Sequence, residues 1–415
     1  MKKILFPAVL CLLSLGFAAC SDDEEETAAA GTSASGEAMS AQNPLLTESQ
    51  YGVLDYYVNN VVISTYSALL NASIDFYDKV NVLLAARTQD NVNAACEAWR
   101  SAREQWEFSE AFLFGTATES QIDPHMDSWP LDNTQLARLL ASNTFSSVTD
   151  GAEARADLLR SNYGNSLMGF HAAEYVIFEN GNPKAVAKIS DEEYAYLQAT
   201  ALVLAEDCAR LKAGWAGAEG LKGREAEIYN RIADDYGISK NYGQFMLRTG
   251  QQGSINSGFS VAVSEILGGM SDITDEVGNT KMENPIAKNS VLEVESWYSW
   301  NSLDDFENNL RGVRMAYTAN NGAGLSVRQL VQAKNIAADN TIMTNIETAI
   351  TALEGIRAAY GSYRTLIEQR GSAAKQDANV VKAQAALADL TDALVAAQGY
   401  YYDLVNKYTS KQVYE

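Results

Sequence analysis

The stretch TESQYGVLDYYVNNVVISTYSALL, residues 47–70, carries a clear helix signal. Thr47 and Gln50 have the spacing of a capping box, in which each side chain satisfies a backbone N–H group at the start of a helix. Apolar side chains then recur near the helical period, at Leu54, Val58, Val61, Val62, Leu69 and Leu70. The stretch therefore predicts a long helix with one buried face.

Similar patterns follow along the whole chain. Further helices are expected at about 91–114, 131–140, 153–178, 190–212, 259–282, 302–317, 326–360 and 377–408. Alternating strand patterns are nearly absent, and only six prolines interrupt the 415 residues. Because proline breaks helix interiors, this distribution favours helix. We predict an all-α fold.

The predicted helices fall into two groups around a glycine-containing stretch. We predict two helical-bundle domains in series, at 45–213 and 259–415, with a connector at 214–258. An acidic residue followed by Ser-Trp precedes a helix once in each half, at 127–129 and 295–297. This repeated triplet, together with the similar bundle patterns, favours a duplication.

The N-terminus is predicted to be a lipoprotein signal peptide, residues 1–19. A basic start, a short apolar run and small residues lead to Cys20, which resembles the lipidation site of bacterial lipoproteins. A secretory signal with a chance cysteine is the alternative. Residues 20–44 are expected to form an acidic, flexible tether, whose run at 21–26 resembles the surface-export signal of Bacteroidetes-type bacteria. We therefore predict a surface-exposed outer-membrane lipoprotein held to the membrane by lipid on Cys20.

Charge and rare residues narrow the possible functions. Lys and Arg number 31 against 53 Asp and Glu, a net charge of −22 that argues against nucleic acid as a partner. With His125 and His171 as the sole histidines, neither a three-His site nor the two-His zincin motif is possible. Cys96 and Cys208 could form a disulfide, but the sequence is at least as compatible with two buried free thiols.

The segment GFHAAE, residues 169–174, concentrates chemistry on one predicted helix. His171 and Glu174 stand three residues apart and share a face that otherwise looks buried. A buried carboxylate is costly unless it is paired or bound to a cation. A metal or ligand site and an internal His–Glu hydrogen bond both fit this pattern.

A second polar pair lies on an apolar stripe of the helix predicted at 91–114. Arg103 and Glu110 share this stripe with Trp99, Trp106 and Leu113. Charged groups in such a setting indicate either an ion pair between helices or part of a site.

These segments together resemble the imelysin family. The resemblance rests on Gly169-x-His171-x-x-Glu174, on the helix around Arg103, on Asp127-Ser128-Trp129-Pro130 and on the segment 295–306. Imelysins are similar to the insulin-cleaving membrane protease and to periplasmic components of ferrous-iron transporters. The resemblance implies two helical bundles related by duplication, a site in the groove between them, and an iron-linked or peptidase role.

We expect a divalent metal, iron, zinc or manganese, with one nitrogen ligand and several carboxylates. His171 and Glu174 would be ligands or ligand orienters, with Glu110 and Asp127 as further ligands, and Arg103 would hold Glu110 or an anionic group. The remaining predicted ligand-binding residues are Trp129, Glu295 and Trp297, with the two tryptophans as walls of the groove. A di-iron centre of the ferritin type needs two Glu-x-x-His motifs and is excluded.

The function we predict is binding of a metal ion, iron in the first place, or of a metal-containing ligand, in iron uptake. An outer-membrane transporter or another iron-uptake component would be the partner. One alternative is a metal-dependent peptidase with Glu174 or Glu110 as general base. The other is a non-catalytic surface module for a peptide, a glycan or a partner protein.

Overall fold

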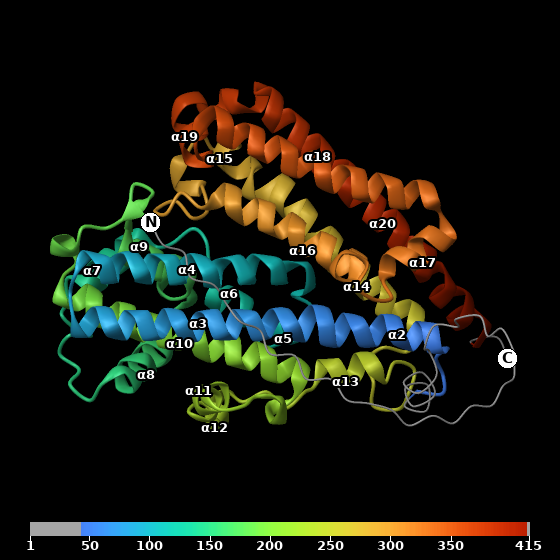
Figure 1. Ribbon diagram of the computed structural model, residues 1–415, viewed down its shortest axis with the longest axis horizontal. Coiled ribbons are helices and arrows are strands. Elements are labelled where there is room, and N and C mark those ends of the chain that lie inside the picture. The colour runs from blue at the N-terminus through green and yellow to red at the C-terminus, as the bar shows by residue number, and fades with distance from the viewer. Residues whose placement is uncertain (1–42, 413–415) are drawn as a thin grey trace, which may run out of the picture.

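The computed structural model describes residues 43–412. The predicted signal peptide, the predicted lipidation site Cys20 and nearly all of the predicted tether lie outside the described residues. Within them the all-α prediction is confirmed, since the strands β1 (Phe178–Glu179) and β2 (Asn182–Pro183) form a single small hairpin among helices (Figure 1). No helix in this part of the chain combines the length and apolar character that a membrane span needs.

The first half of the fold consists of long helices joined by short ones. Its elements are α2 (Glu48–Tyr56), η1 (Tyr57–Val62), α3 (Ile63–Ala85), α4 (Gln89–Ser109), η2 (Glu110–Phe112), α5 (Thr116–Glu119), α6 (Asp123–Met126), α7 (Asn133–Leu140), α8 (Ala152–Asn162), η3 (Asn165–Leu167), α9 (Phe170–Ile177), η4 (Val186–Lys188) and α10 (Asp191–Ala216).

The rest of the chain continues in the same way. Its elements are η5 (Ala218–Gly220), α11 (Arg224–Asn230), α12 (Ala233–Tyr236), α13 (Tyr242–Leu247), α14 (Phe259–Glu276), η6 (Val277–Lys281), α15 (Glu283–Ala287), η7 (Val291–Glu293), α16 (Ser302–Gly322), α17 (Val327–Lys334), α18 (Ile336–Tyr360), α19 (Tyr363–Arg370), η8 (Gly371–Gln376) and α20 (Ala378–Gln412).

The capping box predicted at Thr47 is present. The Thr47 hydroxyl accepts from the Gln50 backbone N–H at 3.2 Å, and the Gln50 side chain accepts from the Thr47 N–H at 2.9 Å. The helix that starts there continues through the π-helix η1 into α3 and ends at Ala85. The pattern at 47–70 was therefore interpreted correctly, and the helix is longer than that stretch.

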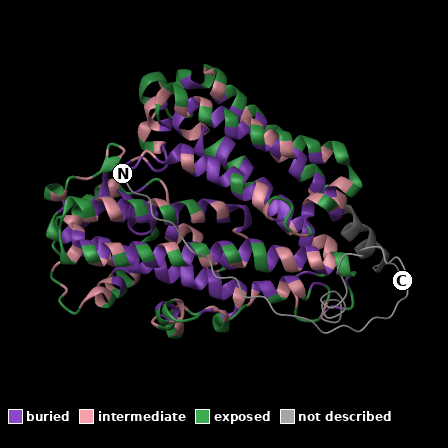
Figure 2. Ribbon diagram, viewed as in Figure 1, coloured by how far each residue is buried: buried purple, intermediate pink, exposed green. Residues whose placement is uncertain are grey.

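The long helices pack as two groups. Helix α3 packs against both α4 and α10 in the first half, and α20 packs against both α14 and α18 in the second (Figure 1). Helix α16 bridges them, because it contacts both α4 and α18. The buried apolar residues of both groups belong to one continuous core, and Figure 2 shows buried residues along the helices of both groups. The domain boundaries and the duplication stay predictions.

A glycine permits the close approach of α16 to α4. A Cβ atom on Gly312 would lie 2.4 Å from the Phe108 carbonyl oxygen, which is too close for any side chain. The two backbones therefore come together where the two helix groups meet. This seam carries the polar cluster described below.

The prediction of a single helix at 153–178 is wrong. Helix α8 ends at Asn162, and α9 begins at Phe170 after a turn. Gly169 precedes α9 with a left-handed φ of 86°, and a Cβ there would lie 2.1 Å from the Met126 carbonyl oxygen. Only glycine combines a left-handed φ with the absence of a Cβ atom. This explains why the 169–174 segment begins with glycine.

The two cysteines that follow Cys20 in the sequence are buried and free. The Cys96 thiol donates to the Ile177 carbonyl at 3.3 Å, whereas Cys208 lies 3.1 Å from the Ser73 hydroxyl. Each thiol therefore has its own polar partner, and the structure favours the reading of two buried thiols over a disulfide.

Candidate metal centre

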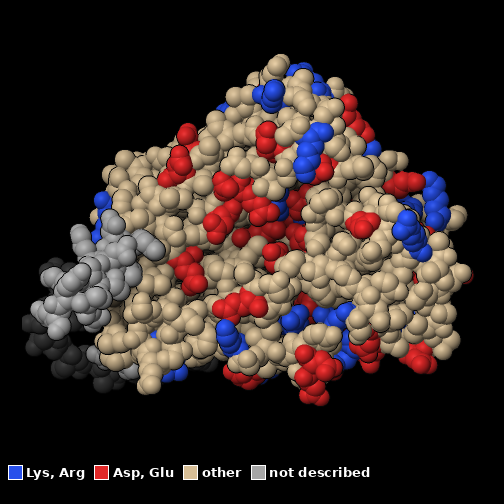
Figure 3. All heavy atoms as spheres, turned by 180° about the vertical axis from the view of Figure 1, so that it is seen from behind, with Lys and Arg blue, Asp and Glu red and all other residues tan. Residues whose placement is uncertain are grey.

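A cleft of about 350 Å³ opens at the seam between the two helix groups. Carboxylates dominate its polar lining, and Figure 3 shows acidic side chains gathered in a hollow on this face. Two lysines, Lys281 and Lys288, also line it. The lining carboxylates are Glu110, Asp123, Asp127, Glu276, Glu293 and Glu295.

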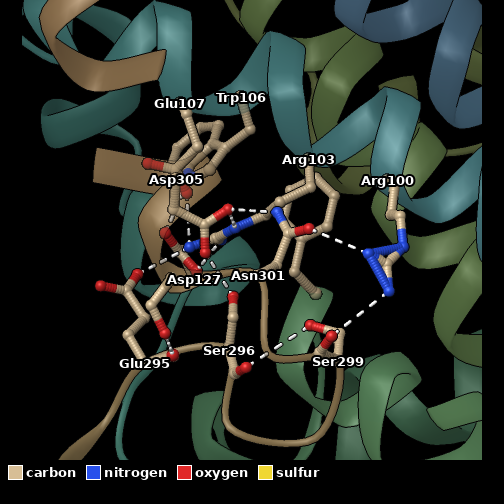
Figure 4. A network of polar contacts seen from close by, with 12 residues as sticks. Arg100, Arg103, Trp106, Glu107, Asp127, Glu295, Ser296, Ser299, Asn301 and Asp305 are labelled. Carbon is tan, nitrogen blue, oxygen red and sulfur yellow. Dashed lines mark hydrogen bonds and ion pairs between the residues drawn. The ribbon is translucent and has the colours of Figure 1, made fainter. Parts of the chain in front are cut away.

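Arg103 of α4 lies behind the cleft and is fully buried. Its guanidinium pairs with Glu107 at 2.5 Å and Glu295 at 2.6 Å, and with Asp127; Asp305 lies 3.6 Å from its Nε (Figure 4). Burial lowers the pKa of Arg103, but Asp127 and the other carboxylates outweigh it and raise the pKa well above its usual value. Arg103 therefore joins acidic groups from both halves of the chain.

His171 lies at the start of α9 and is 1% exposed. Its Nδ1 lies 3.0 Å from Glu174 Oε2, and its Nε2 faces Asp127 Oδ1 at 3.0 Å and Glu295 Oε1 at 3.9 Å. Nε2 has no well-directed hydrogen bond. Burial lowers the pKa of His171, but the neighbouring carboxylates of Asp127, Glu174 and Glu295 raise it well above its usual value. One edge of the ring is thus fixed, and the other faces carboxylate oxygens.

Glu174 orients His171 and ties it to the second half of the chain. Its other oxygen, Oε1, accepts from the backbone N–H groups of Tyr298 at 3.0 Å and Ser299 at 2.7 Å, and from the Ser299 hydroxyl at 2.6 Å. Metal-binding histidines commonly have such a carboxylate behind the ring. With both oxygens engaged, Glu174 is placed to position His171 and not to act as a general base.

Lys281 lies at the end of the π-helix η6 and reaches into the same cluster. Its ammonium lies 2.9 Å from Glu110 Oε2, 3.3 Å from Glu295 Oε1 and 3.7 Å from Glu107 Oε2. The Asn309 side-chain amide donates to Glu107 at 2.6 Å and Glu110 at 2.8 Å. Glu107 and Glu110 are therefore held together by one cation and one amide.

Two overlapping sets of ligand atoms are grouped closely enough for one metal ion. Asp127, His171 and Glu295 form one set, and Glu107, Glu110 and Asp127 form the other, with all atoms of a set within 4.8 Å of one another. Imidazole nitrogen with carboxylate oxygen suits iron, manganese or zinc. Asp127 belongs to both sets. The first set is the stronger candidate because it includes the nitrogen of His171.

The cluster holds more carboxyl groups than cations to balance them. Burial raises the pKa of Glu107 to about 8, although Arg103 and Lys281 oppose the shift. Burial and the neighbouring Glu107 raise the pKa of Glu110 well above its usual value. Carboxyl groups thus outnumber the cations Arg103 and Lys281 here, and such a surplus favours a further cation.

The structure brings most of the predicted site residues together. Asp127, Glu174 and Glu295 each lie within 4 Å of His171, and Glu110 joins them through Lys281. The expectation that Arg103 holds Glu110 needs correction, because the partner of Glu110 is Lys281. Helix geometry alone could not show this, since Lys281 is 171 residues away.

The two tryptophans predicted as walls have different positions. Trp129 lines the cleft, and its ring lies 4.7 Å from that of His171. Trp297 is not among the cleft residues, and it stacks against the guanidinium of Arg364 at 4.7 Å. The expectation that Trp297 forms a wall of the groove is therefore corrected. The part of this segment that reaches the site is the backbone of Tyr298 and Ser299, which donates to Glu174.

The sequence analysis missed Glu107, Lys281, Asp305 and Asn309. For Glu107 a signal existed, because it stands four residues after Arg103 and forms an ion pair with it along the helix. Lys281 had no such signal, since a π-helix sets its direction.

A helical-bundle protein with a buried histidine–carboxylate centre at the seam of its two halves is the class that this fold and site define. The chain belongs to the imelysin family, whose sequence model matches residues 62–394. Over 341 residues it is 27% identical to iron-regulated protein A of Synechococcus elongatus, with 81% of this chain and 83% of the relative covered.

Two crystal structures share the fold. One, provisionally described as an iron-regulated protein A precursor from Parabacteroides distasonis, has a TM-score of 0.69 and 28% identity over 90% of this chain and 97% of its own. The other, an imelysin-like protein from Psychrobacter arcticum, has a TM-score of 0.52 and 16% identity over 85% and 92%. The second similarity bears on the fold alone.

Proposed function

We propose that this protein binds one metal ion, iron in the first place, through Asp127, His171 and Glu295. The observation that carries the proposal is the state of His171. Its Nδ1 is fixed by Glu174, whereas the buried Nε2 has no directed hydrogen bond and faces two carboxylates. An imidazole oriented in this way is what a metal site needs.

The names of the relatives support the choice of iron. The relatives from Synechococcus elongatus and Parabacteroides distasonis are both described as iron-regulated proteins. The donor atoms themselves suit iron, manganese and zinc alike. Iron uptake, with an outer-membrane transporter or another uptake component as partner, is the biological role we propose.

Metal binding by the purified protein tests the proposal directly. We expect about one equivalent of divalent metal per chain when chelator-treated protein is titrated anaerobically with Fe²⁺, and competition by Mn²⁺ or Zn²⁺. Calorimetry gives the stoichiometry, and elemental analysis after gel filtration checks it. Protein that retains no metal above the buffer background would contradict the proposal.

We also propose that the protein is a surface lipoprotein. Cys20→Ser is expected to abolish lipid attachment and release the protein from membranes, because the acyl chains on this cysteine would supply the anchor. Neutralising residues 22–26 is expected to keep the lipid but reduce surface display. Membrane fractionation measures the first effect, and protease accessibility on intact cells measures the second. Unchanged accessibility would contradict the export signal.

A further inference from the structure

We propose that Lys281 is a tethered cation that an incoming metal ion must displace, so that the centre accepts multivalent cations and rejects monovalent ones. This inference rests on the proposed metal-binding function and adds a determinant of its specificity. Lys281 would thus be neither a ligand nor a simple structural ion pair.

The ammonium of Lys281 lies where the two ligand sets meet. It contacts Glu295 Oε1 of the first set at 3.3 Å, and that same oxygen lies 3.9 Å from His171 Nε2. It also contacts Glu110 of the second set at 2.9 Å. A metal ion bound by either set would therefore compete with this ammonium for carboxylate oxygens.

Of the two cations in the cluster, Lys281 is the one that can leave. Arg103 is fully buried, with carboxylates around its guanidinium and the Phe170 ring 5.3 Å away. Lys281 lines the cleft, which has about 350 Å³ of space, and its four-carbon chain is flexible. Arg103 therefore stays in place as a permanent counter-ion.

The cleft offers the displaced ammonium another place. Asp123 and Glu276 line the same cleft, and both carboxylates interact electrostatically with Lys281. Glu276 lies five residues before Lys281, at the end of α14 where the π-helix begins. The ammonium can thus move without losing all acidic neighbours.

Displacement selects for the charge of the incoming cation. The Lys281 ammonium competes with a free cation for the same carboxylates. Because it is attached to the chain, it competes at an effective concentration of roughly millimolar or above. A monovalent cation only replaces one positive charge by another. A divalent cation adds one positive charge to a cluster that has surplus carboxyls, so it gains more than the ammonium loses.

The test compares Lys281→Met with Lys288→Met in the full chain. Methionine keeps the length and removes the charge, and Lys288 is a matched control because it lines the same cleft but pairs with the outer Glu293 at 2.9 Å. Mn²⁺ is the probe, titrated by calorimetry in potassium chloride and in choline chloride of equal ionic strength.

We expect Lys281→Met to bind Mn²⁺ at least about tenfold more tightly than wild type in choline chloride, because the tethered competitor is gone. Potassium should weaken binding to this variant and leave wild type and Lys288→Met unaffected. Circular dichroism and the melting temperature check the fold, and Lys281→Gln replaces the methionine variant if that one does not fold.

The outcomes separate this inference from the proposed function. Mn²⁺ binding that Lys281→Met leaves equal or weaker, with no potassium effect, would overturn the inference and leave the metal centre standing. Binding by Lys281→Met but not by wild type would overturn both, because the metal ion would then be unable to displace the ammonium. Absence of binding by every folded variant would overturn both.

Discussion

Replacing His171 with alanine is expected to weaken metal binding by about 100-fold or more. The substitution removes the nitrogen of the Asp127–His171–Glu295 set and leaves two carboxylates that Arg103 already pairs with. Loss of an orienting group alone costs about 10–100-fold in affinity, so loss of a ligand costs at least as much. Calorimetric titration of the folded variant with Fe²⁺ or Mn²⁺ measures the effect.

The other histidine of the chain is the control for this experiment. His125 contacts Asp207 of α10 and belongs to neither ligand set, so His125→Ala should retain the affinity of wild type. Glu174→Gln should fall between the two, with a loss of about tenfold, because it weakens the orientation of His171 and leaves the ring in place. Equal affinities for His171→Ala and wild type would exclude His171 as a ligand.

The same variants bear on peptidase activity. Glu174 has both oxygens engaged, which argues against its role as general base. We expect wild type to cleave no peptide substrate, with or without added metal. Chelator-sensitive cleavage that His171→Ala abolishes would instead favour the peptidase alternative.

Arg103→Met is expected to lower the free energy of unfolding by about 3–5 kcal/mol. Removing one partner of a buried ion pair leaves uncompensated charge, which is the costly part of such a change. Here the loss would leave Glu107, Asp127 and Glu295 without their shared counter-ion at the seam between the helix groups. Urea denaturation followed by circular dichroism gives the free energy.

Arg100 offers a matched control on the same helix. It is partly buried and donates to the Asn301 side chain at 3.2 Å and the Ser299 carbonyl at 3.2 Å, both neutral acceptors. Arg100→Met should therefore cost only about 1.5–3 kcal/mol, the usual range for a hydrogen bond with one charged partner, because no buried charge is left unpaired. If Arg103→Met proves no more destabilising than Arg100→Met, the buried network does not stabilise the seam.

The local features of the sequence predicted the local features of the fold. The capping box at Thr47 marked a helix start that the structure contains, because it depends on residues three positions apart. The spacing of His171 and Glu174 predicted their shared face, and the two side chains indeed contact each other. Apolar periodicity was sufficient for the all-α class, since it reports which face of each helix is buried.

Periodicity could not show which buried faces meet, and the tertiary structure alone decided that. Arg103 and Glu295 lie 192 positions apart, and Lys281 and Glu110 lie 171 apart. The contacts between these pairs depend on how α4, η6 and α16 pack across the seam, with Gly312 allowing the close approach of α16. A helical pattern has a range of a few residues, so the sequence determined the helices and the His171–Glu174 pair, whereas long-range packing determined the composition of the centre.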